Sequence, residues 1–197
     1  MKIKEKRGRG RPRAFDRDLA LDRAMEMFRE HGFDGTSMND LTTAMGLSPS
    51  SLYATFGDKE ALYRAAVERY LEGPGSYMGR ILALSGPARD IYAQLMTEAA
   101  HELSGGGCMV ALGAIHCSPQ ARVVQDSMLH RRRQSVAVMA ARIPPEELPP
   151  GVSPQQMAAF TMAVLQGMSV QARDGANEAE LLGIARLALE AWPEAGS

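Results

Sequence analysis

The chain has 197 residues, of which 45% are apolar, and a formal net charge of −1. This length predicts one or two domains, and the apolar fraction is ample for a buried core. The only two cysteines, Cys108 and Cys117, are nine residues apart, which excludes a disulfide framework and a cysteine metal cluster. We therefore expect no metal and no cofactor.

The sequence offers no segment suited to a membrane. Its N-terminus is charged and lacks the apolar stretch of a signal peptide. The longest charge-free run, between Glu147 and Arg173, contains prolines and glutamines and would make a poor membrane span. These features predict a cytoplasmic protein without a membrane partner.

Residues 1–15 are expected to form a flexible basic arm. Within the first 13 residues, seven Lys and Arg stand against one Glu, which gives a charge of +6. The run Arg9-Gly10-Arg11-Pro12 is AT-hook-like, thin and extended, and its arginines suit a narrow, A·T-rich minor groove. We predict that Arg9, Arg11 and Arg13 contact DNA. The alternative is a solvated tail that only raises solubility.

The first helix is expected over residues 16–31, with Asp16 as its N-cap. Apolar residues recur in it at i, i+3, i+4 and i+7, which predicts one buried face. The run His31-Gly32-Phe33 is expected to end the helix. The residues of the buried face are Leu21, Ala24, Met25 and Phe28.

Two short helices follow, over residues 38–45 and 49–55, with a tight turn at Gly46 between them. Ser37 and Asp40 have the spacing of a capping box at the first helix. Ser48 is placed to cap the second helix, with Pro49 at its first position. Two helices joined by such a turn, the second short and rich in hydroxyls, are typical of a DNA-binding helix-turn-helix.

In the second of these helices Leu52 and Phe56 are predicted to face inward, and the hydroxyl side chains outward. Hydroxyl groups suit phosphates and several base edges, and a threonine methyl can meet a thymine methyl. The helix has no Arg, Asn or Gln for bidentate base readout, so direct readout is expected to be weak. With the arm, the predicted DNA-binding residues are Arg9, Arg11, Arg13, Thr36, Ser37, Ser48, Ser50, Ser51, Tyr53, Thr55 and Lys59.

The region resembles the N-terminal domain of the TetR family of bacterial transcriptional regulators. The resemblance rests on thirteen positions between residues 36 and 62, and it covers about the first third of the chain. In the family, the tyrosine and the lysine at these positions commonly contact phosphates, so the resemblance implies the same role for Tyr53 and Lys59. The thirteen positions are Thr36, Asp40, Leu41, Ala44, Gly46, Ser48, Ser51, Leu52, Tyr53, Phe56, Lys59, Glu60 and Leu62.

Six further helices complete an expected total of about nine, and no strand pattern is present. Gly73-Pro74-Gly75 is expected to interrupt the fourth helix. This interruption would be a joint between the N-terminal helices that read DNA, called the head, and the helices after it, called the body. A proline-rich stretch, residues 143–152, predicts a stiff loop. The expected ranges are 59–72 with a resumption over 76–84, then 88–104, 108–116, 119–142, 154–173 and 178–192.

The body contains eight of the thirteen methionines, whose flexible thioethers suit an adaptable apolar pocket. Core filling is the commoner use of methionine, and it remains the alternative for each of them. Together with the family resemblance, the pattern implies a ligand cavity for a small apolar or amphipathic effector. The predicted ligand-binding residues are Tyr92, Met96, Met109, Leu112, His116 and Met128.

The last two helices are apolar on nearly all sides, which predicts burial on two sides. In a body of this size, a second copy of the chain is the simplest partner, and a monomeric core is the alternative. The predicted residues of this homodimer interface are Phe160, Val164, Leu165, Met168, Leu181, Ile184, Ala185 and Ala188.

Two other features have plain interpretations. Cys108 follows three glycines at a helix start, which could favour a reactive thiolate, but a small buried residue is the preferred interpretation. Arg131-Arg132-Arg133 is interpreted as a solvated face. No nucleophile, base and oxyanion site are in register, so no catalytic residue is predicted.

These features predict an all-α protein with an arm (residues 1–15), a helix-turn-helix domain (16–58) and a helical effector-binding and dimerisation domain (59–197). Its predicted function is a DNA-binding transcriptional regulator, a repressor that a small molecule releases from its operator. The alternatives are a DNA-architectural protein without effector and, last, a small-molecule enzyme.

Overall fold

The computed structural model describes residues 16–190 and residue 192. All regular structure in this part of the chain is helical, with ten α-helices and three short 3-10 helices. The α-helices are α1 (Arg17–Gly35), α2 (Met38–Met45), α3 (Pro49–Phe56), α4 (Lys59–Glu72), α5 (Tyr77–Leu82), α6 (Ala88–Leu103), α7 (Met109–Leu112), α8 (Arg122–Ala140), α9 (Pro154–Arg173) and α10 (Glu178–Leu189), and the 3-10 helices are η1 (Pro74–Ser76), η2 (Pro119–Ala121) and η3 (Pro145–Glu147).

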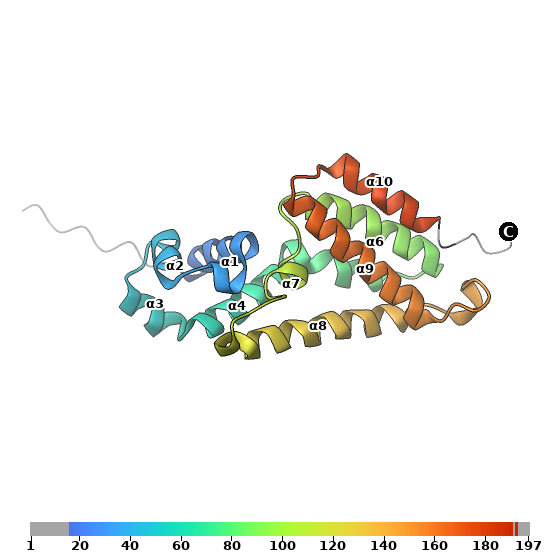
Figure 1. The fold of residues 1–197 in the computed structure, drawn as a ribbon. Helices are drawn as coiled ribbons and strands as arrows, with labels where there is room; N and C mark the ends of the chain where they lie inside the picture. Colours follow the sequence, from blue (N-terminus) through green and yellow to red (C-terminus); the bar gives the residue numbers. More distant parts are fainter. Residues whose placement is uncertain (1–15, 191, 193–197) are drawn as a thin grey trace, which may run out of the picture.

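The molecule is elongated, with α1, α2 and α3 at one end and α6, α9 and α10 at the other (Figure 1). Helix α4 leads from the first group into the second, and α8 runs along the same direction beneath both. Helix α10 packs on α6 and α9, while α4 packs on α1. The all-helical fold predicted from the sequence is confirmed.

Side-chain caps set where the helices of the head begin. Asp16 accepts hydrogen bonds from the backbone N–H groups of Asp18 and Leu19, both at 3.1 Å. Asp58 does the same for Ala61 at 2.7 Å. Such caps satisfy donors that have no partner inside the helix. The predicted start of each helix is confirmed to within a residue.

Gly32 breaks α1 close to its predicted end. Its φ of 72° and ψ of 178° lie outside the helical region, although helical structure resumes as far as Gly35. A Cβ at this position would also lie 3.1 Å from the carbonyl oxygen of Gly113. Glycine is thus required for both the backbone conformation and the close approach of a second segment.

Three predicted helices differ from the structure. Residues 77–82 form a separate helix, α5, because Gly73 ends α4 with a non-helical φ of −109° and ψ of −113°. The predicted sixth helix is only one turn long, α7, and α10 ends at Leu189 before the predicted end. The described residues therefore have ten α-helices where about nine were predicted.

Two clusters of buried apolar residues hold the molecule together. One joins α1–α4 with α7 and the first half of α8 and includes Phe28, Leu41, Leu52, Tyr63 and Met109. The other joins α5, α6, α9, α10 and the end of α8. A fully buried leucine or phenylalanine contributes about 1.5–3 kcal/mol to the free energy of unfolding. The first cluster therefore ties α1, α2 and α3 firmly to α4 and α7.

None of the described helices is long and apolar enough to cross a membrane.

Candidate nucleic-acid interface and effector cavity

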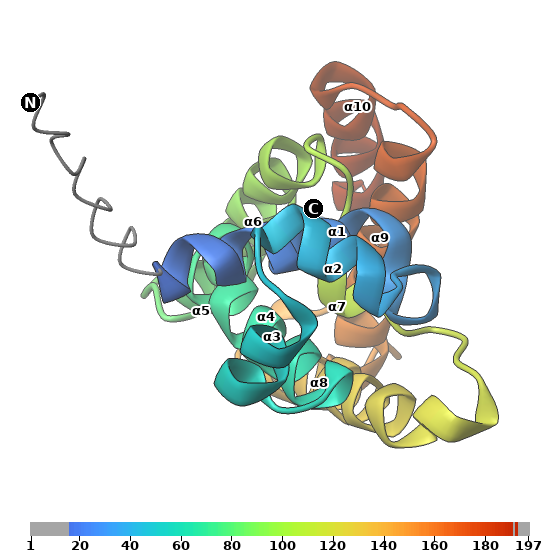
Figure 2. The same ribbon diagram turned by 90° about the vertical axis from the view of Figure 1, so that its left-hand side faces the viewer.

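The turn between α2 and α3 has the geometry that a helix-turn-helix requires. Gly46 has a left-handed φ of 67° and ψ of 34°, and its N–H caps the end of α2. Leu41 in α2 and Leu52 in α3 are both fully buried and fix the crossing of the two helices. Helix α3 consequently lies at the outer end of the molecule, which faces the viewer in Figure 2.

Three serine hydroxyls cluster at the N-terminus of α3. The Oγ of Ser48 accepts a hydrogen bond from the N–H of Ser51 at 3.2 Å and lies 2.8 Å from the Oγ of Ser51. The Oγ of Ser50 lies 3.0 Å from the Oγ of Ser48. All three side chains are exposed. A helix N-terminus with exposed hydroxyl groups is suited to a phosphate group.

Tyr53 and Thr55 differ in exposure. The ring of Tyr53 is 53% exposed, the outward position that the sequence predicts. Thr55 is half-buried, and its hydroxyl donates to the carbonyl oxygen of Ser51 at 2.8 Å. Its methyl group and hydroxyl oxygen are therefore what Thr55 can offer a ligand.

Thr36 does not fit its predicted role in DNA binding. It is 0% exposed, and its hydroxyl donates to the carbonyl oxygen of Gly32 at 2.7 Å. The hydroxyl thus satisfies the carbonyl that the break at Gly32 leaves without a helical partner. Thr36 is a structural residue that secures the end of α1.

Ser37 and Asp40 form the predicted capping box. The Oγ of Ser37 accepts from the N–H of Asp40 at 3.1 Å, and the carboxylate of Asp40 accepts from the N–H of Ser37 at 2.9 Å. Hydrogen bonding from the side chain and the backbone N–H of Ser37 lowers the pKa of the Asp40 carboxyl group. Ser37 is exposed, but its hydroxyl is already engaged in starting α2.

Lys59 begins α4 and is half-buried. Its Nζ lies 4.3 Å from the centroid of the Phe33 ring, a cation–π contact. Burial lowers the pKa of Lys59, and the nearby Asp34 carboxylate opposes this. The ammonium group is thus held at the start of a helix, where both charge and the helix dipole favour an anion.

Arg17 is a further candidate for DNA contact, which the sequence did not predict. Its guanidinium lies 5.1 Å from the centroid of the Phe56 ring, which places an exposed cation beside α3. The available signal was the position of Arg17, directly after the N-cap of the first helix. The predicted contacts Arg9, Arg11 and Arg13 lie outside the described residues.

Helix α7 and the loop after it connect the head to the body. The N–H of Phe33 donates to the carbonyl oxygen of Gly113 at 2.8 Å, and the N–H of Ser118 donates to the carboxylate of Asp34. Helix α7 also packs against α1, α4, α8 and α9. Because the hydrogen bond from Phe33 to Gly113 joins the end of α1 to the residue after α7, a displacement of α7 would act directly on the end of α1.

A cavity of about 350 Å³ lies beside α7. Its walls come from the end of α4, from η1 and α5, and from α7, α8 and α9. This volume is within the range of small-molecule sites, roughly 300–1,000 Å³. The lining residues are Tyr70, Leu71, Gly75, Ser76, Tyr77, Met78, Gly79, Leu82, Cys108, Val110, Ala111, Arg131, Arg132, Gln134, Ser135, Val138, Met162, Leu165, Gln166 and Ser169.

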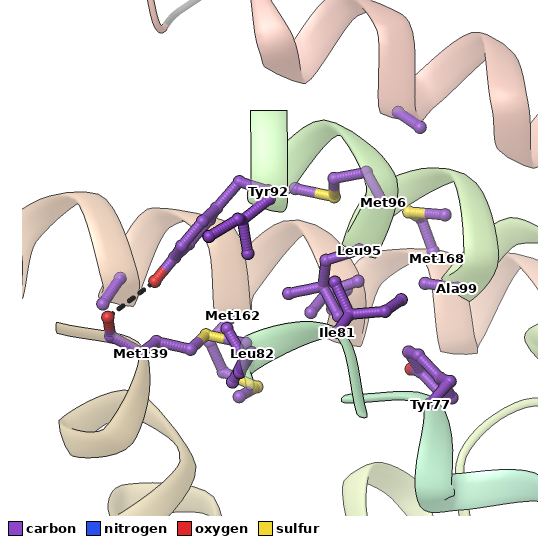
Figure 3. Close-up of a cluster of buried hydrophobic side chains, with 14 of the residues drawn as sticks. Tyr77, Ile81, Leu82, Tyr92, Leu95, Met96, Ala99, Met139, Met162 and Met168 are labelled. Atoms are coloured by element: carbon purple, nitrogen blue, oxygen red, sulfur yellow. Dashed lines mark hydrogen bonds between the residues drawn. The ribbon is translucent and has the colours of Figure 1, made fainter. Parts of the chain in front are cut away.

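None of the six predicted ligand-binding residues lines this cavity. Tyr92 and Met96 lie in the core around α6, where the Tyr92 hydroxyl donates to the carbonyl oxygen of Met139 at 2.8 Å (Figure 3). Met109 and Met128 are buried in the other core cluster. Leu112 is half-buried and His116 is exposed, and both lie outside the lining. Met96, Met109 and Met128 therefore fill the core of this structure, whereas Met78 and Met162 line the cavity.

The basic run on α8 is also not the solvated face that the sequence suggests. Only Arg133 is exposed. Arg131 forms an ion pair with Glu68, and Arg132 donates to the carbonyl oxygen of Val110 at 3.0 Å. Both of these arginines line the cavity.

The eight predicted dimer residues divide between two faces. Leu165, Met168, Leu181 and Ala185 are buried in the core of the protomer itself. Phe160 is 41% exposed, and Val164, Ile184 and Ala188 are half-buried. The outer face of α9 and α10 also includes Val170 and Leu187, which are 44% and 76% exposed and which the prediction missed.

Comparison with known proteins agrees with this geometry. A family model described as bacterial regulatory proteins, tetR family, matches residues 20–66. Two curated relatives from Escherichia coli K12, the HTH-type transcriptional repressors ComR and BdcR, are each 32% identical. The ComR match covers 96% of this chain and 94% of ComR, and the BdcR match covers 95% and 94%.

A solved structure is similar over nearly the same length. It is described as a cysteine mutant of the TetR family transcriptional regulator CifR complexed with 26-bp double-strand operator DNA. It is 38% identical, covers 93% of this chain and 100% of its own, and superposes with a TM-score of 0.85.

Proposed function

The chain belongs to the TetR family of bacterial regulatory proteins, and from this premise we propose that it is a homodimeric repressor released from operator DNA by a small molecule. The relatives ComR and BdcR are named as repressors, and CifR is described in complex with operator DNA. These names support DNA-dependent regulation rather than enzymatic catalysis. A cytoplasmic location follows from this role.

The DNA-reading surface is assigned to the outer face of α3, with Ser48, Ser50, Ser51 and Tyr53 as its contacts. Support comes from their exposure and from the place of α3 at the outer end of the molecule (Figure 2). Two cations lie at the end of this helix: Arg17 contacts the ring of Phe56, and Lys59 begins α4. Residues 1–15 would add the minor-groove arm through Arg9, Arg11 and Arg13. Head (16–58) and body (59–197) are functional divisions that share a core through α4 and α7.

One observation carries the proposed release mechanism: α7 lines the 350 Å³ cavity and also packs against α1 of the head. Val110 and Ala111 of α7 line the cavity, and Gly113, which directly follows α7, is hydrogen-bonded to Phe33 of α1. A ligand that fits better when α7 is displaced would favour a second orientation of the head. A ligand can shift the equilibrium only through such differential affinity.

The test is operator binding with and without candidate effectors, on wild type and on Val138→Trp. Val138 is exposed at the mouth of the cavity, so a tryptophan there should obstruct entry while sparing the fold. The wild type should release its operator with at least one compound, and the variant should bind operator normally but fail to respond. Operator binding that no compound affects would contradict the proposal and favour an architectural role.

A further inference from the structure

The cavity lining has an unusual balance of charge. Its twenty residues include two arginines, Arg131 and Arg132, and neither aspartate nor glutamate. The guanidinium group of Arg131 is neutralised by Glu68, which lies outside the lining. The charge that faces the cavity without such compensation therefore belongs to Arg132.

Arg132 is half-buried and forms no ion pair in the part of the chain that the structure describes. Its Nη1 donates to the carbonyl oxygen of Val110, and its other N–H groups remain for a ligand. Burial lowers the pKa of Arg132, while Tyr63 and Cys108 act in the opposite direction. Burial raises the pKa of the Tyr63 phenol, so at neutral pH this group is uncharged and does not neutralise the guanidinium group.

The rest of the lining is largely apolar and limits the size of the ligand. Leu82, Met162 and Leu165 form part of this apolar lining. A volume of 350 Å³ holds on the order of a dozen non-hydrogen atoms at roughly 30 Å³ for each water-sized group. A ligand of this size can place one polar end against α8 and an aliphatic or aromatic part against α5 and α9.

We propose that the effector is a small amphipathic anion, in its simplest form a carboxylate, whose charged group is bound by Arg132. This inference rests on the proposed function and specifies its ligand. A buried charge is costly unless it is paired, and an anion of the ligand supplies the missing partner. A cationic ligand would instead be repelled, and a neutral one would leave the guanidinium group without a counter-charge.

The same residue connects the ligand to the head. Because Arg132 holds the carbonyl group of Val110, an anion that draws the guanidinium group toward the cavity strains or replaces this hydrogen bond. Helix α7 would then shift, and with it the Gly113 contact to Phe33 at the end of α1. Arg132 thus determines both ligand specificity and transmission to the DNA-reading end.

The experiment compares three probes of equal chain length: octanoate, octan-1-ol and octylamine. Their binding to the full-length protein is measured by titration calorimetry, and their effect on operator affinity by fluorescence anisotropy. The variants are Arg132→Gln, the matched control Arg133→Gln on the exposed side of the same helix, and Val138→Trp. Thermal unfolding of each variant verifies that it is folded.

Octanoate should bind wild type at least about tenfold more tightly than octan-1-ol, since a hydrogen bond between two charged groups is stronger than one to a neutral hydroxyl. Octylamine should bind more weakly than either of the other two probes. Arg132→Gln should remove the preference for octanoate, Arg133→Gln should retain it, and Val138→Trp should lose the binding of both octanoate and octan-1-ol. Equal binding of octanoate and octan-1-ol, or an unchanged preference in Arg132→Gln, would overturn the anion proposal alone. Binding that is insensitive to Val138→Trp would overturn the cavity as the effector site, and with it the proposed function.

Discussion

At the scale of single residues, the outer face of α3 is distinctive because it presents hydroxyl groups and one aromatic ring. Ser48, Ser50 and Ser51 are exposed, and Tyr53 is the largest exposed side chain among them. Such groups bind phosphates and read bases only weakly. The affinity of the head for DNA is therefore expected to depend on contacts to the phosphates of the DNA backbone, and the contact of Tyr53 should be among the strongest.

Tyr53→Ala should weaken operator binding by about tenfold or more, because it removes a hydrogen bond to a charged phosphate worth about 1.5–3 kcal/mol. Thermal unfolding should change little, since the ring is 53% exposed. The measurement is anisotropy against labelled operator, with Tyr53→Phe as the matched control that keeps the ring and loses the hydroxyl. Unfolding or aggregation of Tyr53→Ala would show that the ring belongs to the core.

A second residue-scale prediction concerns Gly113, at the contact between α7 and the head. A Cβ there would lie 2.4 Å from the hydroxyl oxygen of Tyr63 and 2.5 Å from the carbonyl oxygen of Met109. Overpacking of this kind costs about 1–3 kcal/mol, so Gly113→Ala should lower the midpoint of thermal unfolding.

Gly79→Ala is the matched control for this substitution. A Cβ at Gly79, within α5, would meet nothing within 4 Å. Alanine is favoured over glycine inside a helix, so Gly79→Ala should raise the free energy of unfolding by about 0.5–1 kcal/mol. Equal unfolding midpoints for the two variants would contradict the close packing of Gly113 on Tyr63.

The sequence predicts which side chains of a helix are buried and which are exposed only where the helix has one apolar and one polar side. Leu52 and Phe56 are buried and Tyr53 is exposed, as predicted, because α3 alternates apolar and polar positions. Thr36 lies inside the protein because its hydroxyl donates to the carbonyl oxygen of Gly32, four residues earlier, where α1 departs from helical geometry. The sequence marks the end of the helix but not the side on which the Thr36 hydroxyl lies.

At the scale of elements, the short helix α7 is the structural link of the molecule. It packs against α1, α4, α8 and α9, and it lines the cavity through Val110 and Ala111. Caps such as Ser153 and Asn177 made most helices predictable, since both form capping boxes. Helix α7 has no side-chain cap and only four residues, so its length and its contacts depend on packing that the sequence does not display.

The basic arm yields the prediction at this scale. Replacing both Arg9 and Arg11 with alanine should weaken operator binding and flatten its dependence on salt. The log–log slope should fall by roughly two units for each arm that binds, because fewer counterions are released. Binding measured over a series of salt concentrations gives the slope, with Arg133→Ala as a control for loss of positive charge elsewhere. An unchanged slope would show that the arm does not contact DNA.

At the scale of the whole molecule, the outer face of α9 and α10 is the surface best suited to a second copy. Leu187, Phe160 and Val170 are exposed on it, whereas Leu165 and Met168 on the opposite side of α9 fill the core. The sequence could predict that these helices are buried on two sides, but it could not assign residues to each side. A helix that is apolar all round has no polar face to mark which side meets solvent.

Because α9 has one side in the core and another on the outer surface, only substitutions on the outer surface can test the proposed dimer. Leu165→Glu would place a charge in the core of the protomer and unfold it, so it cannot isolate the interface. Leu187→Glu and Phe160→Glu place the charge on the outer face instead. Burying an unpaired charge costs several kcal/mol, so the two variants should be monomers that unfold at nearly the wild-type temperature. Light scattering reports the mass, and Arg186→Glu, on the exposed surface of α10, serves as the control for added negative charge.

In the proposed dimer, two heads can occupy two half-sites of the operator only if the dimer holds them at a fixed distance. We expect an operator with an imperfect inverted repeat whose half-sites are about 34–36 Å apart, or a multiple of that distance. The Leu187→Glu monomer should bind the operator and a scrambled duplex with similar, weak affinity, because one α3 alone makes few base contacts. Gel shifts on both duplexes test this. A wild-type protein with the 21.3 kDa mass of a monomer that still binds its operator tightly and selectively would contradict the dimer and the two-site reading together.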